Sequence, residues 1–145
     1  MNQTVVFPTL TINHFLDSFC DAKDNSYRER IMAGHFIEKR EKLNGLARKL
    51  GSKLPAALSA FSGLHKEALK DGALSRKHKE LTALGIAICS HCEGCIAYHV
   101  HDALKAGASE EELIETIGVA VMMGGGPSMV FGSEALEAIE QFKSA

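Results

Sequence analysis

The sequence predicts an all-helical fold, and three observations support this prediction. The 145 residues contain three prolines, none of which lies between residues 56 and 126. A β-sandwich of this length would normally carry more turn-forming residues. Apolar residues recur at helical spacing along most of the chain, and hydrophobic residues make up 46% of it, enough for a folded core. We therefore expect a compact unit of six to seven helices.

Two helices are predicted in the N-terminal third. Apolar side chains at Thr11–Ala22 follow the spacing of one helix face. A longer helix is expected from about Tyr27 to Leu50, with a narrow apolar seam and Gly51 as its C-terminal cap. Such a helix often lies on the outside of a fold or against a partner subunit. We interpret the charged residues 28–42 as a solvated face.

The next two helices are predicted from their first residues. Pro55 suits the first turn of a helix that stops near Gly72. The expected core face of that helix consists of Leu58, Phe61, Leu64, Ala68 and Leu69. Ser75 is placed to cap the following helix, which runs from Arg76 toward Ser90.

Three further helices complete the predicted fold. Residues 91–94 interrupt the periodicity, and a helix follows from about Cys95 to Ala106. Ser109 and the glutamate three residues later form a capping box that begins another helix. Residues 124–127, three glycines and a proline, end it, and a last helix covers residues 128–143. We expect residues 1–50 to be a helical extension that packs on the core or on a partner subunit, and residues 51–145 to be the core.

The charge balance excludes two classes of partner. The chain has 16 Lys and Arg against 18 Asp and Glu, a net charge of −2. This balance attracts neither nucleic acid nor an anionic membrane. The first residues do not resemble a signal peptide, and no stretch reaches 18 apolar residues. We therefore expect a cytoplasmic protein with no membrane or nucleic-acid partner.

Cysteines are the most informative residues of the chain. Three of the four, Cys89, Cys92 and Cys95, lie within seven residues, which is unlike the spread of a disulfide framework. Clustered cysteines in a reducing compartment indicate redox chemistry or metal binding. We interpret Cys20 and Cys89 as packing residues, because a single cysteine is usually a small buried hydrophobe.

Cys92 and Cys95 form a CxxC motif with a histidine and a glutamate at informative spacings. His99 lies four residues after Cys95, on the same helix face. Glu80 lies on the preceding helix and returns beside His99 if the two helices pack antiparallel. A thiol must lose its proton before it attacks, an imidazole can take that proton, and a carboxylate can orient the imidazole. The second cysteine can then close an intramolecular disulfide.

The pattern from Lys79-Glu80-Leu81 through Cys92-x-x-Cys95-x-x-x-His99-x-x-x-Ala103 resembles the alkylhydroperoxidase-D-like / carboxymuconolactone decarboxylase family. The resemblance continues to Ile114 and covers roughly residues 55–125. It implies an all-helical fold that forms homo-oligomers, trimers or hexamers. It also implies peroxidase or disulfide-reductase activity on a peroxide or disulfide substrate, with a thiol reductant. We predict neither a cofactor nor a metal for this site.

The resemblance also implies a role for each site residue. Glu80 is the carboxylate of a proton relay and His99 is its imidazole. Cys95 meets the oxidised substrate and Cys92 resolves the product, although the helix dipole alone would favour Cys92 as the attacking thiol. Some family members place a second histidine between the two cysteines. Glu93-Gly94 stands there in this chain, which leaves His91 as a substitute.

Two alternatives remain open from the sequence. One is a non-redox enzyme of the same fold, resembling carboxymuconolactone decarboxylase, although that branch lacks the CxxC motif. The other is a structural zinc site that uses Cys92, Cys95 and His99, with His91 and His101 nearby. All of these ligands lie within eleven residues, whereas structural zinc sites usually draw ligands from two separate elements.

Overall fold

The computed structural model describes residues 34–145, so the helix predicted at Thr11–Ala22 lies outside the described residues. The described chain is helical and contains no strand, which confirms the predicted fold class. Its helices are α3 (His35–Lys53), α4 (Pro55–Ala68), α5 (Arg76–Cys89), α6 (Glu93–Lys105) and α7 (Glu110–Ser144).

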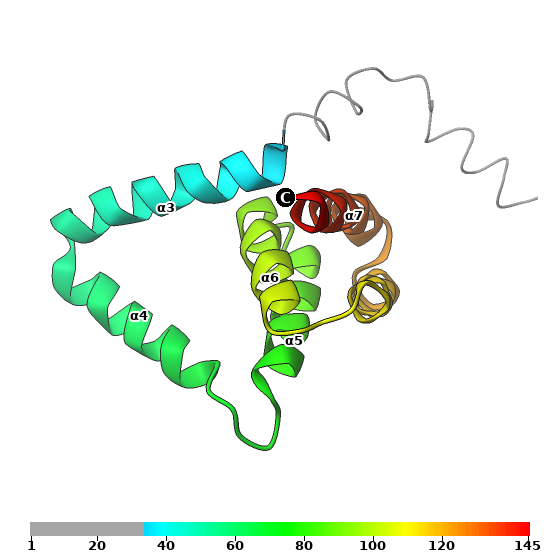
Figure 1. Cartoon of the computed structure of the whole chain (residues 1–145), viewed down its shortest axis with the longest axis horizontal. Helices are drawn as coiled ribbons and strands as arrows, with labels where there is room; N and C mark the ends of the chain where they lie inside the picture. Colours follow the sequence, from blue (N-terminus) through cyan, green and yellow to red (C-terminus); the bar gives the residue numbers. More distant parts are fainter. Residues whose placement is uncertain (1–33) are drawn as a thin grey trace, which may run out of the picture.

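Helices α5, α6 and α7 pack against one another and form the body of the molecule (Figure 1). The body contains most of the hydrophobic core. Its largest fully buried apolar side chains are Leu84, Ile88, Ile96, Val100, Leu113 and Ile139. Buried alanines lie between them on the same helices, and their small side chains let the helix backbones approach closely.

Most of the predicted helix starts are confirmed. Ser75 accepts a hydrogen bond from the backbone N–H of His78. Ser109 and Glu112 form the reciprocal capping box. Pro55 stands in the first turn of α4. The predicted cap at Gly51 is wrong, because α3 continues to Lys53. Pro55 provides the stop instead, since the residue before a proline is pushed out of the helical region.

Helix α7 consists of two antiparallel segments. Gly125 has φ 69° and ψ −153°, a conformation that favours glycine, and Pro127 follows two residues later. An ion pair joins Lys143, near the end of α7, to Glu110 at its beginning. A Cβ on Gly132 would lie 2.8 Å from Ile117 Cγ2, so this glycine permits close contact between the two segments. The predicted break at residues 124–127 is confirmed.

Among the described helices, α7 alone is long and apolar enough to cross a membrane by length and composition. From the sequence, we expected no segment that is apolar enough to span a membrane. Because α7 turns back at Gly125, its 35 residues form two segments that pack in the body and not one straight helix. The apolar window of α7 is only 17% buried, so packing within the hairpin and the body leaves much of its apolar surface exposed.

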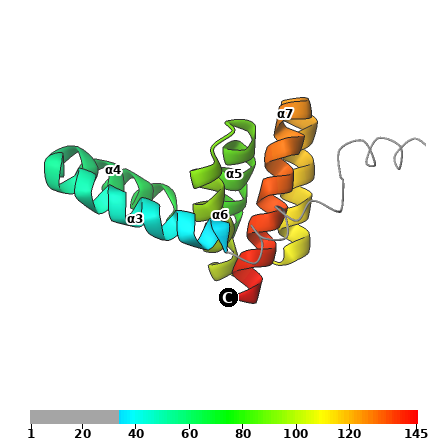
Figure 2. The same cartoon turned by 90° about the horizontal axis from the view of Figure 1, so that it is seen from above.

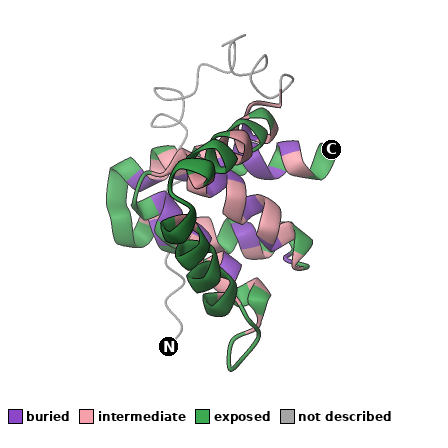
Figure 3. Cartoon of the chain, turned by 90° about the vertical axis from the view of Figure 1, so that its left-hand side faces the viewer, coloured by how far each residue is buried: buried purple, intermediate pink, exposed green. Residues whose placement is uncertain are grey.

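Helices α3 and α4, which we call the arm, extend away from the body (Figures 1 and 2). In the described chain, α4 contacts α3 and no other helix, and none of its residues is buried (Figure 3). The prediction of a core face on α4 is therefore wrong: Phe61 is 64% exposed and Leu64 66% exposed. The apolar pattern exists, but no described element of this chain packs against it.

The first half of α3 is attached to the body. Phe36 is buried, and its backbone N–H donates to Gln141 Oε1 over 2.7 Å. The interpretation of residues 28–42 as a solvated face agrees with the exposure of Glu38, Glu41 and Lys42. It is wrong for His35, Lys39 and Arg40, which form ion pairs with α6. The sequence could not show this, since the partner residues lie more than 50 positions away.

An apolar groove of about 610 Å³ lies between α5 and the first segment of α7. Its lining includes Leu74, Leu81, Ile86, Cys89, Val119 and Met123. The prediction that Cys89 is a core residue is wrong: its thiol is free and exposed, and it donates to the backbone oxygen of Ala120 over 3.4 Å. The apolar run around Cys89 faces this groove as well as the core.

Candidate redox site

The two cysteines of the CxxC motif form a disulfide at the beginning of α6. The Cα atoms of Cys92 and Cys95 are 5.2 Å apart. Cys92 is the N-cap residue of α6, and its Sγ accepts a hydrogen bond from the backbone N–H of Cys95 over 3.3 Å. In the reduced protein, the same N–H and the positive end of the helix dipole would stabilise a thiolate on Cys92.

Glu80 and His99 form the predicted carboxylate–imidazole pair. Glu80 on α5 is fully buried, and its Oε2 lies 2.9 Å from Nδ1 of His99 on α6. The His99 side chain keeps 20% of its surface exposed. Because a carboxylate only accepts hydrogen bonds, Nδ1 carries the proton, and Nε2 is left free to take a proton from a thiol. The pair is therefore arranged as a general base with a fixed tautomer.

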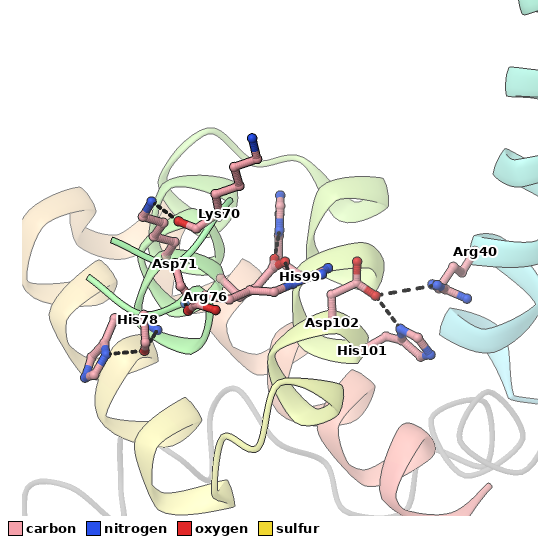
Figure 4. Close-up of polar contacts among 11 residues, drawn as sticks. Arg40, Lys70, Asp71, Arg76, His78, His99, His101 and Asp102 are labelled. Atoms are coloured by element: carbon pink, nitrogen blue, oxygen red, sulfur yellow. Dashed lines mark hydrogen bonds and ion pairs between the residues drawn. The ribbon is translucent and has the colours of Figure 1, made fainter. Parts of the chain in front are cut away.

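Arg76 completes the polar surroundings of Glu80. Its Nε lies 3.5 Å from Glu80 Oε1, and that oxygen accepts no hydrogen bond from any described residue. Arg76 and His99, both labelled in Figure 4, pair with the same carboxylate of Glu80. The guanidinium supplies positive charge beside this buried group. Arg76 is one helical turn before Glu80, a spacing that could have identified it from the sequence.

The other histidines near the motif have different contacts. His91 has a φ of 56° and stacks on the ring of Phe131 in α7, with centroids 4.8 Å apart. His101 Nδ1 pairs with Asp102 over 2.6 Å. Within residues 34–145, no three histidine, cysteine or acidic side chains converge in a way that could hold a metal ion.

Helix α3 contacts the two residues between the cysteines. Glu93 Oε1 lies 2.5 Å from His35 Nε2, and Glu93 Oε2 pairs with Lys39 Nζ. A Cβ on Gly94 would lie 2.8 Å from Leu43 Cδ1, so the chain passes closely beneath α3 at this point. Burial raises the pKa of the Glu93 carboxyl, but the hydrogen bonds and charges of Lys39 and His35 outweigh it and lower the pKa overall.

This all-helical fold has a CxxC disulfide at the start of α6 and a buried carboxylate that pairs with an imidazole of the same helix. Such an arrangement can support thiol redox chemistry. The model of the carboxymuconolactone decarboxylase family matches residues 55–138. The chain belongs to this family.

Two solved structures of the same family are similar to this fold. A carboxymuconolactone decarboxylase family protein from Legionella pneumophila is 42% identical with a TM-score of 0.73, and the match covers 74% of this chain and 96% of that protein. A family protein from Thermotoga maritima, for which involvement in an antioxidative response has been suggested, is 28% identical with a TM-score of 0.65. That match covers 76% of this chain and 91% of the other.

Two sequence relatives are similar over about 60% of this chain. An uncharacterised protein from Cupriavidus necator is 41% identical over 87 residues, which are 60% of this chain and 77% of the relative. An uncharacterised protein in the cox locus of Paracoccus denitrificans is 35% identical over 86 residues, 59% of this chain and 78% of the relative. The match to the family model, residues 55–138, includes Glu80, the two cysteines and His99.

Proposed function

We propose that the protein is a thiol-dependent oxidoreductase that cycles Cys92 and Cys95 between dithiol and disulfide. The observation that carries this proposal is the contact between the buried Glu80 carboxylate and the His99 ring. His99 lies on α6, the helix that begins at the disulfide. A carboxylate that fixes an imidazole beside a thiol pair is the arrangement that thiol activation requires.

The proposed reaction starts from the reduced enzyme. His99 takes the Cys95 proton, and the thiolate attacks the outer oxygen of a hydroperoxide, which breaks the O–O bond. The leaving alkoxide takes a proton and departs as an alcohol, and Cys95 becomes a sulfenic acid. The Cys92 thiolate then attacks the Cys95 sulfur, closes the disulfide and releases water.

The reductive half returns two electrons and two protons. A dithiol reductant attacks the Cys92–Cys95 disulfide, passes through a mixed disulfide, and leaves oxidised as its own disulfide. A disulfide substrate would be reduced by the same exchange in reverse. Such a cycle needs a reducing compartment, which agrees with the cytoplasmic location that we propose.

The exposed apolar surfaces support a homo-oligomer as the working form. Two apolar surfaces of each chain are uncovered by the described residues. One is the face of α4 with Phe61 and Leu64, and the other is the groove with Ile86 and Met123. Surfaces of this kind mark association sites. Native mass measurement is expected to give a trimer or a hexamer, and a clean monomer at micromolar concentration would contradict this part of the proposal.

The activity is tested with variants of the four site residues. We expect Cys95→Ser to abolish peroxide reduction and dithiol-dependent disulfide reduction. We expect Cys92→Ser to form a sulfenic acid on Cys95 that reacts with dimedone but does not turn over. Glu80→Gln and His99→Gln are expected to slow thiolate formation by about 10- to 100-fold, the range of lost general-base catalysis. Cys89→Ser is the matched control, because it removes a free thiol that lies outside the motif.

Each alternative predicts a different result. If a dimedone adduct forms on Cys92 in the Cys95→Ser variant, the order of attack is reversed. An activity that survives the double change of both cysteines to serine would indicate a non-redox enzyme of the decarboxylase type. About one zinc per chain in protein purified under reducing conditions would indicate the metal-binding alternative.

A further inference from the structure

Helix α3 places two cationic groups against the CxxC turn. Lys39 and His35 lie one helical turn apart and both contact the carboxylate of Glu93, which directly follows Cys92. The three side chains are between one quarter and two fifths exposed, so their charges are only partly screened by water. The residue next to the disulfide is thus held by a helix that is more than 50 positions away in the chain.

The contact is part of a wider docking of α3 on α6. Tyr98 donates a hydrogen bond to Asn44 Oδ1 over 2.8 Å, and Arg40 lies 5.6 Å from the centre of the Tyr98 ring. Arg40 also pairs with Asp102 over 3.6 Å. These contacts hold α3 against α6, and they therefore fix the position of the Lys39 backbone relative to Glu93.

The charge of Glu93 alone would work against the proposed chemistry. A negative group beside Cys92 disfavours a thiolate, because like charges raise the free energy of ionising the second group. Lys39, and His35 when it is protonated, supply positive charge to the same place. The described groups that face Glu93 are these two residues of α3, and both lower the pKa of its carboxyl.

We propose that α3 belongs to the redox site and that Lys39 and His35 are positioning residues that act through Glu93 to tune the Cys92–Cys95 dithiol. They hold the carboxylate in an ion pair and compensate its charge, which keeps the neighbouring thiols easy to ionise. A thiol that ionises more readily also stabilises the reduced state of the pair, so the reduction potential is higher than with Glu93 unpaired. This inference rests on the proposed redox function.

The proposal is tested by two substitutions with opposite expected signs. Lys39→Met leaves the Glu93 charge uncompensated. Iodoacetamide alkylation of the reduced cysteines at neutral pH should slow by about threefold, and the potential should become more negative. Glu93→Gln removes the negative charge and leaves the cations, so alkylation should accelerate by about the same factor and the potential should rise. The double variant should return toward the wild-type rate.

Lys42→Met is the matched control. It removes the same charge from an exposed position of the same helix, and Lys42 has no ion pair within residues 34–145. It should leave both the alkylation profile and the potential unchanged. If the α3 contact were purely structural, Lys39→Met and Glu93→Gln would both lower the stability of the fold. The two variants would then not shift the alkylation rate and the reduction potential in opposite directions.

The outcomes separate this inference from the function on which it rests. Equal shifts in the same direction, or no shift in either variant, would overturn the tuning role even when the wild-type dithiol cycles normally. Alkylation rates need no turnover, so they report on tuning even if the wild-type protein reduces no peroxide or disulfide. If the wild-type protein turned over neither peroxide nor disulfide, the proposed redox function would be wrong. Opposite shifts in the two variants would then show only that the charges of α3 affect the ionisation of the two thiols.

Discussion

The body and the outer half of the arm contain similar apolar patterns, but these patterns are buried in the body and exposed on the arm. On α5, Leu84 and Ile88 are fully buried between α6 and α7. On α4, Phe61 and Leu64 follow an equally regular spacing and are mostly exposed. The periodicity of a helix therefore predicts which face is apolar, whereas burial depends on whether another element covers that face. In the described chain only the body supplies such an element.

The same contrast applies to the site. The body provides Glu80, His99 and both cysteines from two adjacent helices, and the turn between these helices brings the groups together. The arm contributes only the near end of α3, through Lys39 and His35. The proposed chemistry is thus placed on the best-packed elements, where side-chain positions are fixed, whereas the least-packed helix carries exposed apolar side chains.

The largest effect expected from this comparison is on stability. Leu84→Ala should destabilise the protein by about 3 kcal/mol, because a fully buried leucine leaves a cavity. Leu64→Ala should cost less than about 0.5 kcal/mol in the dissociated chain, because exposed side chains contribute little. Urea unfolding at several protein concentrations measures both. The Leu64 effect should grow with concentration if α4 packs in an oligomer, and equal effects at high dilution would contradict the contrast.

Helix caps sharpen the comparison at an intermediate magnitude. Ser109→Ala removes the capping box of α7 in the body and should cost about 1 kcal/mol. Leu54 is the N-cap residue of α4 and supplies no side-chain cap, so Leu54→Ala should leave the cap energy of the arm unchanged. Thermal unfolding followed by circular dichroism compares the two variants. A larger loss from Leu54→Ala would mean that the arm is anchored in solution by contacts of Leu54.

The fold class and the approach of Glu80 to His99 could be predicted from the sequence because both depend on local spacing. The catalytic roles of Glu80, Cys92, Cys95 and His99 stay predictions. The 3.6-residue period places His99 one turn after Cys95, and the short turn at residues 90–92 makes α5 and α6 antiparallel neighbours. Glu80 could be assigned because the small residues around it allow close helix packing. These inferences needed no knowledge of contacts between distant segments.

What the sequence could not predict depends on those distant contacts. The attachment of Lys39 to Glu93 joins residues 54 positions apart, and neither carries a motif. The exposure of Cys89 follows from the groove between α5 and α7, which exists only once α7 has turned back at Gly125. The surface of α4 was misjudged for the same reason, because its periodicity gives no information on what covers it.

The smallest expected effect is the pH dependence of the contact between arm and body. The pKa of Glu93 lies below its ordinary value of 4.5 in the folded protein, so its ion pairs stabilise the fold above that pH. This contribution is lost as the pH falls below about 4.5 and through the folded value. Because Glu93 is about one third exposed, the contribution should stay under about 1 kcal/mol.

Urea unfolding between pH 6 and about pH 3 measures this contribution. Glu93→Gln should lose less stability on acidification than the wild type, since glutamine does not titrate. Glu41→Gln removes an exposed carboxylate from α3 and should follow the wild-type curve. Identical acid profiles for Glu93→Gln and the wild type would show that the ion pairs between α3 and α6 do not stabilise the fold.

A redox titration of the purified protein tests the central claim most directly. Equilibration with dithiothreitol buffers of graded potential, followed by alkylation and mass analysis, counts the free thiols at each potential. The account predicts that Cys92 and Cys95 are lost together in one two-electron step, while Cys89 stays free throughout. Cysteines that oxidise separately, or a Cys92–Cys95 pair that stays reduced at every potential, would contradict it.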